Sequence, residues 1–184
     1  KNETENFDEN LKIINNQIKQ IGNLVNEFSD FARMPKPILK ENNVIKIIEE
    51  NIKLLNELDN TINIYINTNK NEIFLNSDKE QLARVFFNLI KNSIESIQQR
   101  AENDSNLEKK ITIEVNEENN HILINIIDNG VGLGIFSGNI KDILNPYFTT
   151  KKNGTGLGLS IVSKIINDHN GKIEFIPLDE GVKI

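Results

Sequence analysis

Two asparagines and a lysine, Asn88, Lys91 and Asn92, lie close together in a segment whose apolar residues have helical spacing. Residues four apart share one face of a helix, so the carboxamides of Asn88 and Asn92 would point in the same direction. Their oxygens are suitable ligands for a hard cation such as Mg²⁺. Taken alone, a chance pair without function is the simpler interpretation, because the chain is rich in asparagine.

A second motif, Asp128-Asn-Gly130-Val-Gly132, directly follows the apolar segment 122–127. A carboxylate at the end of a strand can accept a hydrogen bond from an exocyclic amine such as that of adenine. The two glycines would let the backbone approach a flat ring closely. A simple Asn-Gly turn between strands is the alternative interpretation of this motif alone.

The last two motifs could bind and cover an anion. Gly154-Thr-Gly156-Leu-Gly158 precedes a helical pattern, where exposed N–H groups and the helix dipole favour negative charge. The segment Pro146–Lys152 combines aromatic, hydroxyl and cationic side chains, which suits a mobile lid over a charged ligand. Each motif is weak alone. The glycine motif lacks the preceding strand of a dinucleotide fingerprint and the G-K-[ST] of a P-loop, and a solvent-facing loop with one anchoring Phe would resemble the lid.

The elements that must position these motifs follow from the spacing of the apolar residues. In the first 33 residues this spacing alternates between three and four, which predicts a helix with a coiled-coil seam and a partner helix. The seam consists of Leu11, Ile14, Ile18, Ile21, Val25, Phe28 and Ala32. Pro35 and Pro37 end the helix and divide the chain into segments 1–37 and 38–184. An ordinary amphipathic helix packed on its own domain remains the alternative.

Beyond Pro37 the pattern predicts helices mixed with mostly antiparallel strands, and therefore a two-layer α/β sandwich. Ser77 and Asp78 supply N-cap chemistry for the long helix that carries the asparagines, and Gly171 is expected to close the final helix. The helices are expected at about 42–58, 78–97 and 159–169, and the strands at 62–66, 73–75, 111–115, 122–126 and 172–176.

The composition excludes several classes of function. A formal net charge of -6 argues against nucleic-acid binding, which needs a basic face. The absence of cysteine excludes disulfides, thiolate metal sites and cysteine nucleophiles. No apolar run approaches the ~18 residues of a membrane-spanning helix.

In chain order, the four motifs resemble the N, G1, F and G2 boxes of the GHKL ATP-binding superfamily. Their combination is similar to the catalytic domain of bacterial sensor histidine kinases, and Phe28–Pro37 resembles the end of the second dimerisation helix in NtrY-type nitrogen-regulation kinases. The resemblance implies a Bergerat-type ATP-binding fold. It also implies that segment 1–37 is one helix of a dimerisation hairpin whose first helix is missing, and that the ATP-binding domain lacks its last strand.

The resemblance further implies ATP and Mg²⁺ as cofactors. Asn92 would ligate the Mg²⁺, Asn88 would line the same site, and Lys151 would complete the catalytic set near the phosphates. Asp128 would bind the adenine amino group, with Gly130 and Gly132 against the base. The remaining residues implied in nucleotide binding are Lys91, Phe148 as the lid anchor, Thr149, Gly154, Thr155, Gly156, Leu157 and Gly158. The stretch Leu133–Asn145 departs from the usual Pro-Glu-Glu type turn of the family.

The residue at position 88 favours a kinase over a hydrolase. In the superfamily's ATPases a Glu at the corresponding position activates water, whereas a carboxamide cannot act as a general base. A GHKL-type ATPase and a degenerate dimerisation module remain alternatives. A protein-serine kinase of the anti-sigma type is disfavoured by the heptad helix that ends in Phe-Ala-Arg-Met-Pro.

The two histidines, His121 and His169, do not fit the His-Glu motif of a phosphoacceptor box. We expect His121 to be a solvated turn residue, and His169 to bear a partial positive charge at a helix C-terminus. The acceptor would then belong to the missing helix. The resemblance implies a homodimer formed through the hairpin, a response regulator as partner, and a cytoplasmic fragment of a bacterial inner-membrane sensor, with the membrane reached only through missing upstream segments.

Overall fold

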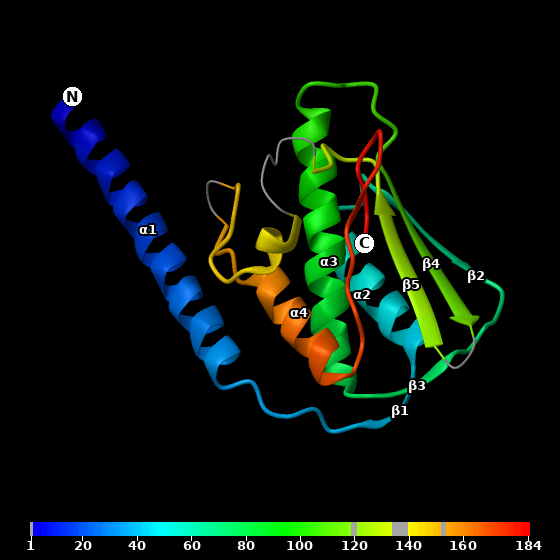
Figure 1. Cartoon of the computed structure of the whole chain (residues 1–184). Helices are drawn as coiled ribbons and strands as arrows, with labels where there is room; N and C mark the ends of the chain where they lie inside the picture. Colours follow the sequence, from blue (N-terminus) through cyan, green and yellow to red (C-terminus); the bar gives the residue numbers. More distant parts are fainter. Residues whose placement is uncertain (1, 119–120, 134–139, 152–153) are drawn as a thin grey trace.

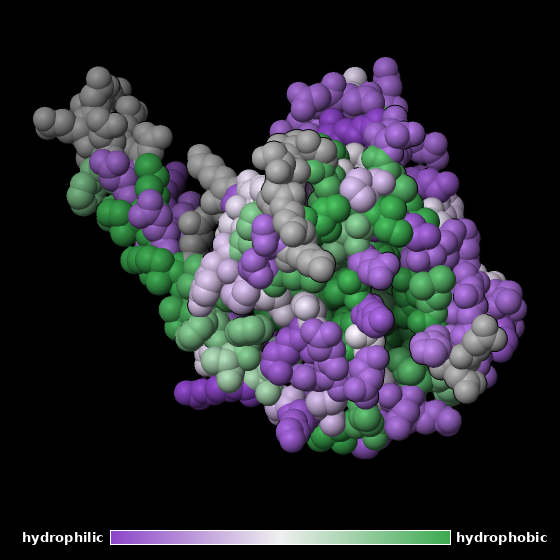
Figure 2. All heavy atoms as spheres, in the orientation of Figure 1, coloured by the Kyte–Doolittle hydropathy of each residue, from purple (hydrophilic) through white to green (hydrophobic). Residues whose placement is uncertain are grey.

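A long N-terminal helix projects away from the rest of the chain (Figure 1). The computed structural model describes residues 2–118, 121–133, 140–151 and 154–184. The predicted helix forms as α1 (Asn2–Ala32), and its apolar seam is largely solvent-exposed, with Ile18 at 61% and Ile21 at 64%. Figure 2 shows these apolar residues along the surface of α1. Phe31 and Met34, near the C-terminal end of the helix, pack against the main core. The seam residues that precede them are exposed to solvent.

The predicted sandwich is confirmed. The main sheet has the strand order β2-β4-β5-β7-β6, with β2 parallel to β4 and the other pairs antiparallel. A separate two-stranded sheet pairs β1 with β3. The strands are β1 (Lys40–Asn43), β2 (Asn63–Thr68), β3 (Phe74–Ser77), β4 (Lys110–Glu118), β5 (His121–Asp128), β6 (Ile176–Pro177) and β7 (Val182–Lys183).

The helices cover one face of the main sheet (Figure 1). They are α2 (Val44–Leu58), α3 (Lys79–Ala101) and α4 (Gly158–Asp168), and the 3-10 turn η1 (Ile140–Leu144) lies against α4. Alternate residues of β4, namely Ile111, Ile113 and Val115, are fully buried beneath them. Strand periodicity therefore identified the covered face correctly.

Two strand expectations were incomplete. β1 was not expected, because its sequence Lys-Glu-Asn-Asn has no apolar alternation, and it forms by pairing with β3. The strand expected over 172–176 is wrong for most of its length, since β6 begins only at Ile176. Ile173 does pack against the core, but β7 is two residues long and gives residues 172–175 no partner for a ladder.

Asp78 caps α3 as predicted. One carboxylate oxygen accepts hydrogen bonds from the N–H groups of Glu80 and Gln81, both at 3.1 Å, and the other accepts from Ile38 N–H at 2.9 Å. Burial acts to raise the pKa of Asp78, but these backbone donors outweigh it and hold the pKa below its ordinary value. The cap therefore also fastens the segment that follows Pro37.

The end of α4 is fastened to the start of α3. The N–H of Gly171 donates to Ile166 O at 2.8 Å and that of Asn170 to Asn167 O at 2.9 Å, a Schellman closure. Gly171 thus takes part as expected, but the left-handed residue is Asn170, with φ 59°. His169 then bridges the two helices, because its Nε2 lies 3.0 Å from Asp78 N and its Nδ1 lies 2.8 Å from Ile165 O.

These partners assign His169 a neutral ring. Nε2 can accept the Asp78 N–H only when it carries no proton, and Nδ1–H then donates to the carbonyl of Ile165. The expected structural role of His169 is therefore confirmed. The hydrogen bond from Asp78 N–H requires a neutral ring, however, and not the expected positive charge.

His169→Ala should lower the free energy of unfolding by about 1–3 kcal/mol, because it leaves a part-buried N–H of Asp78 without its acceptor. Urea denaturation at pH 7 measures the change. Lys172→Ala, an exposed residue three positions later, is the control and should change stability by less than about 0.5 kcal/mol. Equal effects of the two substitutions would contradict the bridge.

The stability that Asp78 provides should be lost in acid. Because its folded pKa lies below the unfolded value of about 3.9, the contribution is complete above that pH and disappears as pH falls through the folded pKa. Asp78→Asn should therefore be less stable than the wild type at pH 7, and the gap should shrink at pH 3. The control is Asp179→Asn, in an exposed turn. The difference in stability between this variant and the wild type should be the same at pH 7 and at pH 3.

Candidate functional site

The motifs at Asn88 and Gly158 lie side by side, although 70 residues separate them. The Nδ2 of Asn88 donates to Arg84 O at 2.8 Å, which fixes the carboxamide on α3. A Cβ atom at Gly158 would lie only 3.1 Å from Asn88 Oδ1, so the absence of a side chain lets α4 begin against α3. α4 has no side-chain N-cap bond, and its first N–H groups remain available to an anion.

The third motif reaches α3 through Lys151. Its Nζ lies 3.0 Å from Oδ1 of Asn92 and forms an ion pair with Glu95. On the other side, Lys91 Nζ lies 3.8 Å from the second Glu95 oxygen. The expected residues Lys91, Asn92 and Lys151 are therefore brought together. Glu95 was missed, and its only sequence signal is its place three residues after Asn92 on the same helix face.

Asp128 lies at the end of β5 and is almost completely buried. Its Oδ1 accepts from the N–H of Gly130 at 2.9 Å. Burial raises its pKa, and the N–H groups of Gly130 and Val182 and the nearby Ser93 hydroxyl oppose that shift only in part.

Ser93 Oγ is close enough to Asp128 to favour the charged carboxylate, but it makes no hydrogen bond within the described residues. Buried polar groups are normally satisfied, so an unpaired hydroxyl beside a buried carboxylate fits a ligand that supplies the missing partner. Sequence reasoning did not select Ser93. The available signal was its position next to Asn92, turned toward the sheet.

The glycines after Asp128 serve close packing. A Cβ atom at Gly130 would collide with Ser96 of α3, and one at Gly132, where φ is 66°, would lie 2.7 Å from Gly181 O. Arg100 holds the same loop by donating to Asn129 O at 2.9 Å and pairing with Glu180 at 3.0 Å. The expected contact of these glycines with a base stays a prediction.

The lid residues pair with the glycine motif through their backbone. The N–H of Tyr147 donates to Gly156 O at 2.9 Å, and both residues have positive φ, 68° and 70°. A side chain at Gly156 would collide with the Tyr147 backbone, so the two loops fit only with glycine there. Thr149 Oγ1 accepts from Lys151 N–H at 3.1 Å, and Gly154 N–H donates to Lys151 O at 3.2 Å.

The remaining residues expected in the lid and the glycine motif differ in burial, and some of them lie outside the described residues. Phe148 is half-buried, which is compatible with an anchor, and Leu157 is fully buried beneath the start of α4. Lys152 of the expected lid and residues 134–139 of the stretch Leu133–Asn145 lie outside the described residues.

α1 contacts both loops. The Thr155 hydroxyl donates to the Glu27 carboxylate, and the ring of Phe28 stacks on Tyr147 with centroids 6.5 Å apart and an interplanar angle of 27°. Thr155, expected to contact phosphate, is therefore bonded to α1 here. Tyr147 lies in the expected lid segment, whereas Glu27 was not selected from the sequence, because a contact across 128 residues leaves no local pattern.

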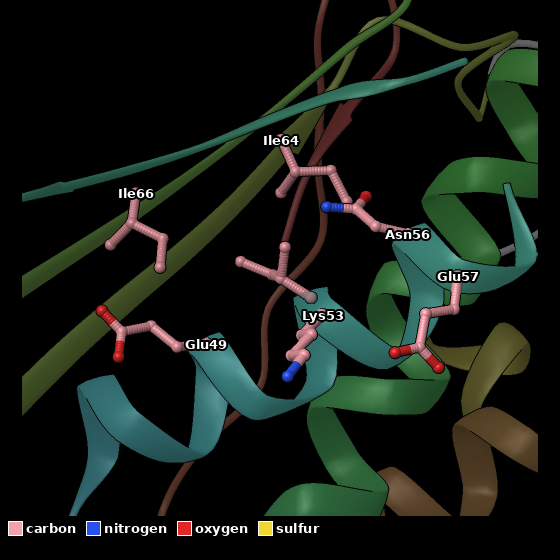
Figure 3. A pocket seen from close by; sticks show the side chains of 7 residues that line it. Glu49, Lys53, Asn56, Glu57, Ile64 and Ile66 are labelled. Atoms are coloured by element: carbon pink, nitrogen blue, oxygen red, sulfur yellow. The ribbon is translucent and has the colours of Figure 1, made fainter. Parts of the chain in front are cut away.

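A cleft lies elsewhere on the molecule. It has a volume of about 600 Å³, lies between α2 and β2, and has Ile64 and Ile66 at its floor and Glu49 and Lys53 at its rim (Figure 3). None of the motif residues lines it. A second hollow of about 430 Å³ borders Gly130, with Arg100 and Glu180 in its wall. Lys91, Asn92, Glu95 and Lys151 instead gather on the polar face of α3, and none of them lines the cleft in Figure 3.

Comparison with known proteins agrees with this arrangement. Residues 77–183 match the family described as histidine kinase-, DNA gyrase B- and HSP90-like ATPases. The chain is 34% identical over 175 residues to the nitrogen regulation protein NtrY of Azorhizobium caulinodans, covering 95% of this chain and 22% of that protein. It is 30% identical over 173 residues to sporulation kinase E of Bacillus subtilis, covering 93% and 22%. The chain thus spans less than a quarter of the length of these relatives.

Solved structures agree as well. The catalytic domain of histidine kinase ThkA superposes with a TM-score of 0.66 at 29% identity, over 79% of this chain and 92% of that one. ThkA in complex with the response regulator TrrA superposes with a TM-score of 0.69 at 23% identity, over 93% and 47%. By sequence and by fold, the chain belongs to the histidine kinase-, DNA gyrase B- and HSP90-like family of ATP-binding domains, in the form that histidine kinases have.

Proposed function

We propose that this chain is the ATP-binding catalytic part of a sensor histidine kinase, which transfers the γ-phosphoryl group of ATP to a histidine. The observation that carries the proposal is Asn88, fixed by its bond to Arg84 one turn before Asn92. A carboxamide there can position a ligand but cannot remove a proton from water. Phosphoryl transfer to a histidine needs positioning and charge neutralisation above all, and this polar face supplies both.

In this proposal each group has a defined task. Asp128 accepts from the adenine amine, and the Ser93 hydroxyl gains a partner. The open N-terminus of α4 binds the phosphates, and Lys151 and Lys91 neutralise their charge. Asn92 Oδ1 contributes the protein ligand for Mg²⁺, which neutralises phosphate charge when bound. The described residues contain no cluster of three or more acidic or histidine ligands, which fits a metal bound mainly through phosphate.

The phosphoacceptor is expected outside this chain. Both ring nitrogens of His169 are engaged at the far end of α4, and His121 begins β5 opposite Glu118. We infer that residues 1–37 belong to a dimerisation hairpin and residues 38–184 to the ATP-binding domain. The exposed apolar seam of α1 supports this division, since such a seam needs partner helices.

The partners of the whole protein follow from the same proposal. ThkA has been solved with a response regulator, and we propose that a response regulator receives the phosphoryl group here as well. Among the described residues no helix has the length and apolarity needed to cross a membrane. An inner-membrane location of the whole protein therefore rests on the proposed relation to sensor kinases of the NtrY type.

Asn92→Ala and Asp128→Asn should each abolish ATP binding, because one removes the metal ligand and the other replaces a carboxylate acceptor with a group that also donates. Isothermal titration with ATP and Mg²⁺ measures the loss, and circular dichroism checks the fold. Asn56→Ala, in the remote cleft of α2, is the control and should bind like the wild type. Micromolar affinity retained in either site variant would count against the assignment.

The chain should bind ATP without phosphorylating itself. After incubation with γ-labelled ATP and Mg²⁺, we expect no acid-labile label on the protein. Both ring nitrogens of His169 are engaged, and His121 lies at the other end of β5 from Asp128. Peptide mapping of any labelled material identifies the site. Acid-labile label on His121 or His169 would overturn the proposed division of labour between this chain and a separate acceptor helix.

A further inference from the structure

Glu95 is the only carboxylate that contacts both lysines of the polar face of α3 within the described residues. Its Oε2 pairs with Lys151, and its Oε1 lies 3.8 Å from Lys91 Nζ. Asn88, Lys91, Asn92 and Glu95 are spaced three and four apart, so all four side chains lie on one face of the helix. The motifs described above do not include Glu95.

The same contact places a cation on Asn92. Lys151 Nζ is 3.0 Å from Asn92 Oδ1, the atom that the proposed function assigns to the metal. The Lys151 ammonium group therefore occupies the position beside Asn92 Oδ1 that the metal and the phosphates would take on binding. A polyphosphate and the Glu95 carboxylate would compete for Lys151, because both are anionic acceptors for one donor group.

We propose that Glu95 is a positioning residue that retains Lys151 on Asn92 until a polyphosphate displaces it. This inference rests on the proposed nucleotide-binding function. Glu95 thus lowers affinity for nucleotides that have phosphates and leaves the binding of the base unchanged. The alternative role, a carboxylate that holds the metal through water, requires Glu95 to strengthen binding instead.

The contacts favour competition over metal binding. Both Glu95 oxygens already face ammonium groups, and no second carboxylate stands beside them to complete a hard-cation site within the described chain. The effect should be modest, because 35% of the Glu95 side chain and 41% of the Lys151 side chain are exposed. Half-exposed ion pairs of this kind change a binding constant by about two- to fivefold.

The test compares the wild type, Glu95→Gln, Lys151→Met and the double variant. Titration calorimetry with ATP and Mg²⁺, and separately with adenosine, measures affinity. Glu95→Gln should bind ATP about two- to fivefold more tightly and adenosine equally well. In the Lys151→Met background the same substitution should change ATP affinity by less than about twofold, because the competition has been removed. Glu49→Gln on α2, which changes net charge equally, should have no effect.

A nucleotide-free measurement separates this inference from the proposed function. In lysine-labelled protein without ligand, the Lys151 ammonium signal in NMR should shift and exchange faster in Glu95→Gln, whether or not the chain binds ATP. An unchanged signal would overturn the retained ion pair. Weaker ATP binding by Glu95→Gln would overturn competition and favour metal binding. An equal gain in ATP affinity in the wild-type and Lys151→Met backgrounds would also overturn it, because Glu95 would then act only through its negative charge.

Discussion

The burial of one face of α3 is the constraint on which the rest of the structure depends. Its apolar side chains are packed under the sheet and the other helices, and this fixes the rotation of the helix. The opposite face is then committed to polar residues, and each loop that carries a motif closes onto it: Gly130 against Ser96, Lys151 against Asn92, and Gly158 against Asn88. A helix held this firmly can align groups that come from three separate loops.

The cost of this arrangement is concentrated at Asp128. A carboxylate buried at a strand end is unfavourable, and two backbone N–H groups and a hydroxyl do not fully offset the penalty, so its pKa stays raised. The neighbouring Ser93 oxygen is left without a hydrogen bond within the described residues. A ligand group that donates to the carboxylate and also pairs with the hydroxyl would relieve both deficits together.

The features that could be predicted from the sequence are those that depend on residues close together in the chain. The N-cap at Asp78, the inner face of β4 and the seam of α1 all follow from side-chain chemistry or period. β1 could not be predicted, because Lys-Glu-Asn-Asn pairs only when β3 is beside it. Glu27 was missed because its partner Thr155 is 128 residues away, and Glu95 was missed because its contact with Lys151 joins two distant segments. The strand expected over 172–176 was wrong for most of its length, because β6, which pairs with the two-residue strand β7, consists only of Ile176 and Pro177.

The bridge between His169 and Asp78 makes α3 and α4 two sides of a frame (Figure 1). From Asp78 to Asn88 the rise is about 15 Å, and from His169 back to Gly158 it is about 16 Å, at about 1.5 Å per residue. The two sides match, so the asparagine and the glycine meet at the open end. Insertion of one residue into either side would turn the groups beyond it by about 100° and break this match. Length changes during evolution should therefore be confined to the loops, and these two helical spans should keep a constant number of residues among relatives.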